Sequence, residues 1–326
     1  MNVRLLILAT LSATNAIVAG ATYRAPRTEY GKPDLQGVWN YSSDVPLERP
    51  KEFADRTSLT REERARQNAA REASFDRLLN IGVGLHDKFW LDYVAQVEDL
   101  RTSLITYPED GRLPKLVEGV QRIGGLAAAL NDIKGTLPVR FFGGGIGKDG
   151  PEDRGLFERC IVGPNTGPPF TPGGDNNYMQ IVQTRDYVVL LAEHIHDARI
   201  VPLDGRPFVD GAPRRWYGDS RGRWEGDTLV VETRNFNTLT QSFNDTGTGA
   251  AKIVTERFTR AADNVLDYEA TIVDPGTYQD RIVLSIPMAR FDGRLFEFAC
   301  HENNYSMPMI LSGARTAERE TTGSKP

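Results

Sequence analysis

The sequence is poor in cysteine and histidine, has no cluster of basic residues, and has no long apolar run beyond its first residues. Only two cysteines and four histidines occur in 326 residues, so a metal site built from clustered cysteines is excluded. The 39 basic and 44 acidic residues give a net charge of −5, with no long run of lysine or arginine. We expect no nucleic-acid partner, because neutralising phosphates needs a clustered basic face.

Residues 1–21 have the pattern of a secretory signal peptide. Arg4 supplies a positive start, residues 5–18 are mostly apolar, and residues 19–21 (Ala-Gly-Ala) form a small-residue cleavage site. The apolar stretch is too short and too interrupted to span a bilayer comfortably, and no later segment approaches the length of a membrane span. The chain is therefore predicted to be secreted or periplasmic, with a soluble mature part from Thr22 onward.

The mature chain is rich in segments that alternate apolar and polar residues, a pattern typical of half-buried strands. Turn dipeptides such as Arg185-Asp186 and Asp292-Gly293 stand between them at hairpin positions. The sequence therefore predicts a mainly β fold with antiparallel pairing. The predicted strands cover residues 35–40, 101–107, 178–184, 187–192, 199–203, 223–233, 253–260, 265–273, 281–287 and 295–300.

A region of helical character lies between the first strand and the others, at about 58–135. Thr60 followed by Glu63 is a capping box that opens a charged helix over 58–80. Residues 88–100 place apolar side chains on one stripe and predict a second helix, and 114–130 is a helix weakened by glycines. Residues 22–326 are thus interpreted as a single β domain with a helical insertion.

Cys160 and Cys300 are predicted to form one disulfide, because an oxidising compartment favours pairing. Such a bond closes a very long loop, which the chain-entropy model values at about 4 to 5 kcal/mol. The alternative is a pair of buried free thiols.

Three of the four histidines lie in two polar segments inside apolar sequence. The first segment runs from Glu193 to Arg199 and directly follows a run of valines and leucines. If the strand continues through it, His194 and His196 share one face, and Asp197 and Arg199 lie on the other. We expect acid–base chemistry here; backbone-satisfied histidines and a metal site are the alternatives. The cupin glutamate that would follow the second histidine is absent, so no metal is assigned.

The second polar segment, residues 300–305, places His301 and Glu302 beside Cys300. A disulfide would hold these side chains rigidly, although they could equally be solvated residues at the end of a strand. Six predicted strands start after the first segment, and six reversals restore the original direction of the chain. Both segments are therefore predicted to reach the same rim, with His194 or His196 within about two side-chain lengths of His301.

A third charged segment contains Asp219 and Arg221 on one strand face. This pair could position a carboxylate or phosphate of a ligand. Cross-strand charge pairing within a structural hairpin is the alternative that we favour.

Several short sequence motifs of the chain resemble those of a large group of exported, mainly bacterial proteins without an assigned chemistry. They lie at residues 33–39, 101–105, 153–160, 219–233 and 300–302. This resemblance implies export and a β-rich fold and carries over no catalytic residue. Separately, Gly37-Val38-Trp39 is similar to the Gly-x-Trp start of lipocalins, whose tryptophan closes the barrel base. The expected fold is therefore a lipocalin-like antiparallel β-barrel, with a β-sandwich or small propeller as alternatives.

Two main functions are consistent with these features. The first is an exported, cofactor-independent, non-redox enzyme (lyase, isomerase, cyclase or hydrolase) in which the histidines move a proton and Asp197, Arg199 or Glu302 orients it. Trp39, Trp90 and Tyr178 would line a barrel mouth that binds a small amphipathic molecule. The second is a lipocalin-like carrier without turnover; an envelope interaction module is a third. Substrate, oligomeric state and occupancy of the sequons at Asn40, Asn244 and Asn304 are left open.

Overall fold

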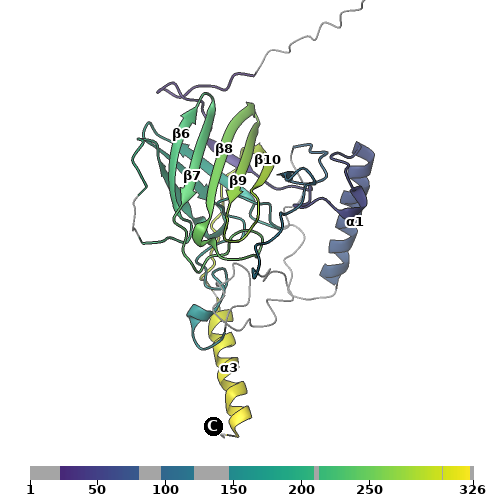
Figure 1. The fold of residues 1–326 in the computed structure, drawn as a ribbon, viewed down its shortest axis with the longest axis vertical. Coiled ribbons are helices and arrows are strands. Elements are labelled where there is room, and N and C mark those ends of the chain that lie inside the picture. Colours follow the sequence, from purple (N-terminus) through teal and green to yellow (C-terminus); the bar gives the residue numbers. More distant parts are fainter. Residues whose placement is uncertain (1–22, 81–96, 121–146, 209–212, 303, 324–326) are drawn as a thin grey trace, which may run out of the picture.

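The computed structural model describes residues 23–80, 97–120, 147–208, 213–302 and 304–323. Nine strands form one antiparallel, nearly closed barrel (Figure 1). The predicted mainly β, barrel-like fold is thus confirmed. A further strand, β2 (Ile105–Tyr107), pairs with β10 outside the path of the barrel. In order around the barrel the nine are β5 (Ala198–Pro202), β4 (Tyr187–Ala192), β3 (Tyr178–Gln183), β1 (Gly37–Asn40), β10 (Ile282–Phe291), β9 (Val265–Val273), β8 (Ile253–Ala262), β7 (Thr228–Arg234) and β6 (Asp219–Glu225).

The barrel interior is filled by side chains that alternate inward along the strands. In β8, Val254, Glu256 and Phe258 are buried while the residues between them are only partly covered. Successive side chains of a strand point to opposite faces, so this alternation defines the core side. Fully burying one large apolar side chain contributes about 1.5 to 3 kcal/mol. The largest fully buried side chains include Trp39, Tyr41, Phe170, Phe236, Phe258 and Tyr268.

Strands β5 and β6 face each other at the seam of the barrel. Nine strands paired antiparallel along the whole path leave these two running in the same direction. Two strands that run in the same direction need a crossover connection, of which residues 203–208 and 213–218 are described. A Cβ on Gly222 would lie 2.6 Å from Leu203 Cδ2 and 2.8 Å from Val201 Cγ1. Glycine at this position thus lets β6 approach the end of β5.

An N-terminal segment covers one end of the barrel. At one end, residues 23–36, here called the strap, cross the turns after β6 and β8 (Figure 1). Arg27 donates to both oxygens of Asp227, and Tyr23 donates to Asp263. Strands β4, β7 and β9 end at the opposite end, here called the cavity end.

The described helices agree with the predictions only in part. Helix α1 (Arg61–Asn80) begins after Thr60, whose backbone N–H donates to Glu63 while Glu63 N–H donates back, as the capping box predicted. Of the predicted helix 88–100, residues 88–96 lie outside the described residues and 97–100 are not helical. Of the predicted helix 114–130, residues 121–130 lie outside the described residues and 114–120 are not helical. Helix α3 (Ser306–Thr322) was not predicted and projects from the cavity end (Figure 1). Short 3-10 turns are η1 (Lys51–Phe53), η3 (Pro151–Asp153), η4 (His194–His196) and η5 (Gly249–Ala251).

Two predicted strands were wrong in their limits. The predicted strand 223–233 is a hairpin of β6 and β7, whose turn lies at residues 226–227. The predicted strand 295–300 is not a strand; this segment leads into a turn at Cys300.

The Cys160–Cys300 disulfide is confirmed. None of the described helices is both long enough and apolar enough for a membrane crossing.

Candidate functional site

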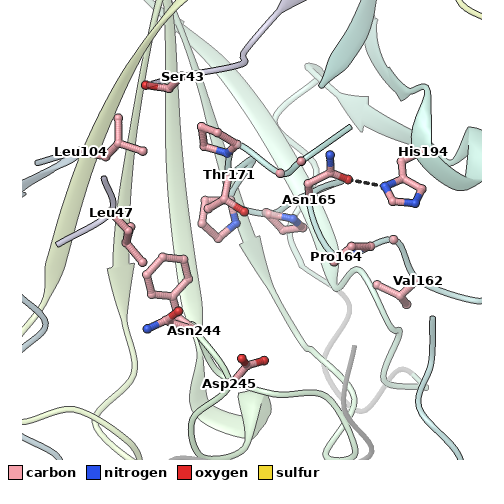
Figure 2. A pocket seen from close by; sticks show the side chains of 18 of the residues that line it. Ser43, Leu47, Leu104, Val162, Pro164, Asn165, Thr171, His194, Asn244 and Asp245 are labelled. Atoms are coloured by element: carbon pink, nitrogen blue, oxygen red, sulfur yellow. Dashed lines mark hydrogen bonds between the residues drawn. The ribbon is translucent and has the colours of Figure 1, made fainter. Parts of the chain in front are cut away.

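A cavity of about 680 Å³ lies at the end of the barrel where β4, β7 and β9 end. Figure 2 shows the side chains that line it. Part of its wall is apolar, and part is the loop 163–174, which is dense in proline and glycine. Such a mixture of apolar wall and a few polar groups is typical of sites for small molecules. The apolar lining includes Val45, Leu47, Leu104 and Phe243, and the titratable lining residues are Arg71, Asp175, His194, Asp245 and Lys252.

The orientation of Asn165 fixes the proton position on the His194 ring. Asn165 Nδ2 donates to the backbone carbonyls of Asp175 and Asn176 at 3.0 and 3.2 Å and to Asn177 Oδ1 at 3.3 Å. Its Oδ1 therefore faces His194 Nδ1, at 2.7 Å (Figure 2). A carbonyl oxygen can only accept, so Nδ1 carries the proton and Nε2 carries the lone pair of the neutral ring.

The turn after β4 contradicts the predicted continuation of the strand. Within η4, Ile195 and His196 adopt left-handed φ angles of 62° and 47°. A β-branched residue in this region is strained, at a cost on the order of 1 to 3 kcal/mol. The turn leaves His194 2% exposed and brings His196 to the surface. The two histidines therefore do not share a face.

Two phenylalanine rings hold the His194 ring from different segments. Phe157 meets it edge-on with ring centroids 5.1 Å apart, and the Phe298 centroid lies 4.3 Å away. Phe157 precedes Cys160 closely in sequence, and Phe298 precedes Cys300. The disulfide therefore ties the two sides of this aromatic clamp together.

Residues 296–298, which precede Cys300, contact the segment 193–199, whereas the predicted proximity of His301 to His194 or His196 stays a prediction. The count of six reversals was wrong, because β5 and β6 run in the same direction and β10 ends at the strap end. The chain after β10 returns to the cavity end, where the Phe296 N–H donates to Glu193 at 2.9 Å. His301 and Glu302 are exposed and do not line the cavity. Their catalytic role stays a prediction.

Asp197 lies beside the base of the loop 163–174. Burial raises the pKa of its carboxyl, which accepts a hydrogen bond from Tyr217. The Tyr217 oxygen in turn accepts from the Gly163 N–H at 3.3 Å and from Thr166 Oγ1 at 3.1 Å. Asp197 thus positions the loop through Tyr217 and is not itself a lining residue of the cavity.

Arg199 points into the barrel and pairs with Glu256 across its interior. The two hydrogen bonds measure 2.5 and 2.9 Å, and both side chains are buried. Tyr268 donates to Glu256 at 2.8 Å, and the Phe170 ring lies 5.0 Å from the guanidinium. Burial would lower the pKa of Arg199, but the Glu256 charge raises it above its ordinary value. This contact network gives Arg199 a structural role in joining β5 to β8.

Two of the three aromatic residues predicted to bind the ligand, Trp39 and Tyr178, do not line the cavity. Trp39 is fully buried in the core, and its indole N–H donates to the Leu35 carbonyl at 2.9 Å. Tyr178 packs against Phe291 with ring centroids 4.7 Å apart. Trp90 lies outside the described residues. The apolar part of the cavity wall is instead formed by aliphatic and proline residues together with Phe157 and Phe243.

Asp219 and Arg221 form an ion pair at 2.7 Å on β6, away from the cavity. Arg221 also donates to the carbonyls of Arg206 and Pro207 at 3.2 Å and stacks on Phe208. Arg221 therefore fastens Arg206 and Pro207 to β6, and its ion pair with Asp219 lies within one strand instead of joining two strands as the structural alternative expected. A ligand-positioning role of the pair stays a prediction.

Lys252 is a cavity residue that the sequence analysis missed. Its side chain is 4% exposed and donates to the Ser242 carbonyl at 2.7 Å. Burial lowers its pKa to about 8, against a smaller opposing effect of the Asp274 carboxylate. The sequence signal was slight: a single lysine in an otherwise uncharged stretch of glycine, threonine and alanine, immediately before the strand at 253–260.

Lys252 is expected to make the protein more stable as the pH rises from about 8 to 10.5. Its folded pKa lies below the unfolded value, so the folded state loses the proton first and the buried charge costs stability below pH 8. The rise amounts to about 3 kcal/mol, at roughly 1.4 kcal/mol per pKa unit. Urea unfolding across this range should show the rise in wild type and its loss in Lys252→Met. Equal slopes in the two proteins would contradict the assignment.

No family model, curated protein or solved structure matches this chain in the three comparisons made. Among the residues that the structure describes, no group of three His, Cys, Asp or Glu side chains is placed to hold a metal ion. The functional interpretation therefore rests on the geometry of the cavity.

Proposed function

We propose that this chain is an exported, non-redox enzyme that binds an amphipathic small molecule in the cavity and uses His194 for proton transfer. The observation that carries the proposal is the His194 ring, which lines the cavity with its tautomer set by Asn165 and its position set by the aromatic clamp. A general base needs a fixed geometry and an available lone pair. The reaction classes that fit are those of a lyase, isomerase, cyclase or hydrolase. The disulfide supports an oxidising compartment.

A binding or carrier protein without turnover is the second candidate. Of the six residues predicted to be catalytic, only His194 lines the cavity described here. Arg199 is engaged with Glu256, and His196, His301 and Glu302 are exposed. This distribution is the observation that supports the second candidate, because a carrier needs no acid–base groups around the molecule that it holds.

The two candidates are separated by incubating the purified protein with a small-molecule extract from its source cells. For an enzyme, mass spectrometry should show one compound depleted and a product of related mass appearing. His194→Gln is expected to slow this conversion by about 10² to 10⁴ fold, the usual contribution of a general acid or base. His196→Gln, on the exposed neighbour, should leave it unchanged.

Retention of a compound on the protein without conversion would support the carrier. Conversion by His194→Gln at the wild-type rate would contradict the role of His194.

A further inference from the structure

Lys252 brings a positive charge to the cavity wall just before β8. Its ammonium donates to two backbone carbonyls, of Ser242 at 2.7 Å and Gln241 at 3.4 Å, and lies 4.3 Å from the Phe236 ring centroid. These partners are neutral, and within the described part of the chain Lys252 makes no ion pair. The Asp274 carboxylate acts on this ammonium from beyond ion-pair distance and offsets only part of the effect of burial. A buried charge without a directly paired counter-charge is costly, so the site favours an anion.

Two residues that are close to Lys252 in the sequence also bring side-chain hydrogen-bond donors to the cavity wall. Ser242 Oγ and Asn244 Nδ2 are buried and make no hydrogen bond to any described residue. Ser242 is 2% exposed, and Asn244 lies at the edge of the cavity in Figure 2. Buried polar groups are normally hydrogen-bonded, so donors without an acceptor in the protein indicate an acceptor on a ligand.

An apolar wall adjoins these donors in the same cavity. Leu47 and Leu104 line it on the side shown in Figure 2, and Phe243 stands between Ser242 and Asn244 in the chain. A molecule that places an anionic group on the donors would lay its apolar part against this wall.

We propose that Ser242, Asn244 and Lys252 form a carboxylate-binding subsite, so that the molecule held in the cavity is an amphipathic carboxylic acid. The proposal rests on the proposed function, because it takes the cavity as the ligand site. A carboxylate accepts several hydrogen bonds and brings a negative charge into direct contact with the Lys252 ammonium. A neutral carbonyl or alcohol would form no ion pair with it.

The other titratable groups around the cavity are each engaged by another partner or lie in another part of the cavity. Asp274 is the carboxylate that acts on Lys252. Asp245 accepts from Gln241 Nε2 at 3.1 Å, and Arg71 donates to the Asp44 carbonyl at 2.6 Å. Asp175 and His194 line the part of the cavity formed by the loop 163–174.

The test measures the affinities of decanoate, decan-1-ol and decylammonium by calorimetry at neutral pH. Wild type is expected to bind decanoate about tenfold or more tightly than the alcohol, since hydrogen bonds to charged groups are worth that much. Lys252→Met should remove this preference and leave alcohol binding intact. Ser242→Ala should weaken decanoate only, and Lys51→Met, which removes an exposed lysine outside the cavity lining, should change neither.

Wild type alone provides a second test through pH. Decanoate affinity is expected to fall about tenfold or more between about pH 7 and 9.5 as Lys252 loses its proton, while alcohol binding stays constant. Equal binding of decanoate and decanol, or a decanoate preference that persists in Lys252→Met, would overturn the subsite and leave the cavity as a ligand site. Binding of none of the three probes would contradict both the subsite and the proposed amphipathic ligand.

Discussion

Replacing Glu256 by glutamine is expected to lower the free energy of unfolding by about 3 to 5 kcal/mol. The substitution leaves the Arg199 guanidinium buried inside the barrel without its counter-charge, at a position where both side chains are almost fully buried. Tyr268 keeps an acceptor, because the glutamine oxygen can replace the carboxylate oxygen that it now contacts. The loss measured by urea unfolding therefore reports mainly on the uncompensated charge.

Two control variants separate this effect from a general sensitivity to charge removal. The double variant Arg199→Met with Glu256→Gln should recover most of the loss, because no isolated charge remains. Asp227→Asn, which breaks the exposed pair with Arg27, should cost about 1 kcal/mol or less. A double variant no more stable than Glu256→Gln would show that the charge is not the cause.

Removing the Cys160–Cys300 disulfide is expected to cost about 4 to 5 kcal/mol, the chain-entropy value for so long a loop. The bond joins residues 140 apart, so its loss frees a large part of the unfolded chain. The double variant Cys160→Ser with Cys300→Ser should unfold at lower urea than oxidised wild type. Reduced wild type should match the variant. A loss below about 1 kcal/mol would indicate that the reduced chain keeps the same restraints.

The strands were predictable because their residues alternate with period two and short turns separate them. The wrong end predicted for β10 has a physical reason. The prediction stopped the strand at Pro287, but the strand continues to Phe291. The Ser285 N–H donates to Leu104 rather than to β9, so the nitrogen of Pro287, two residues on, points to the same side. There it falls between the partners β2 and β1, where no ladder hydrogen bond is needed.

The candidate site was only partly predictable. His194 was found because a histidine between apolar strands is unusual, but the left-handed turn at Ile195 and His196 breaks the periodicity on which the pairing of the histidines depended. The donors at Ser242, Asn244 and Lys252 meet His194 only through the three-dimensional path of the loops. Nothing in local sequence periodicity records such a meeting.

The state of the His194 ring tests the central claim most directly. In a ring-¹⁵N histidine NMR spectrum at neutral pH, the resonances missing from His194→Gln identify this residue. We expect a proton on Nδ1 and none on Nε2, because Asn165 Oδ1 accepts from Nδ1. Adding decanoate should move these resonances and leave those of the exposed His196 and His301 in place. A proton on Nε2, or movement of only the exposed histidines, would contradict a ligand site in which His194 acts as the base.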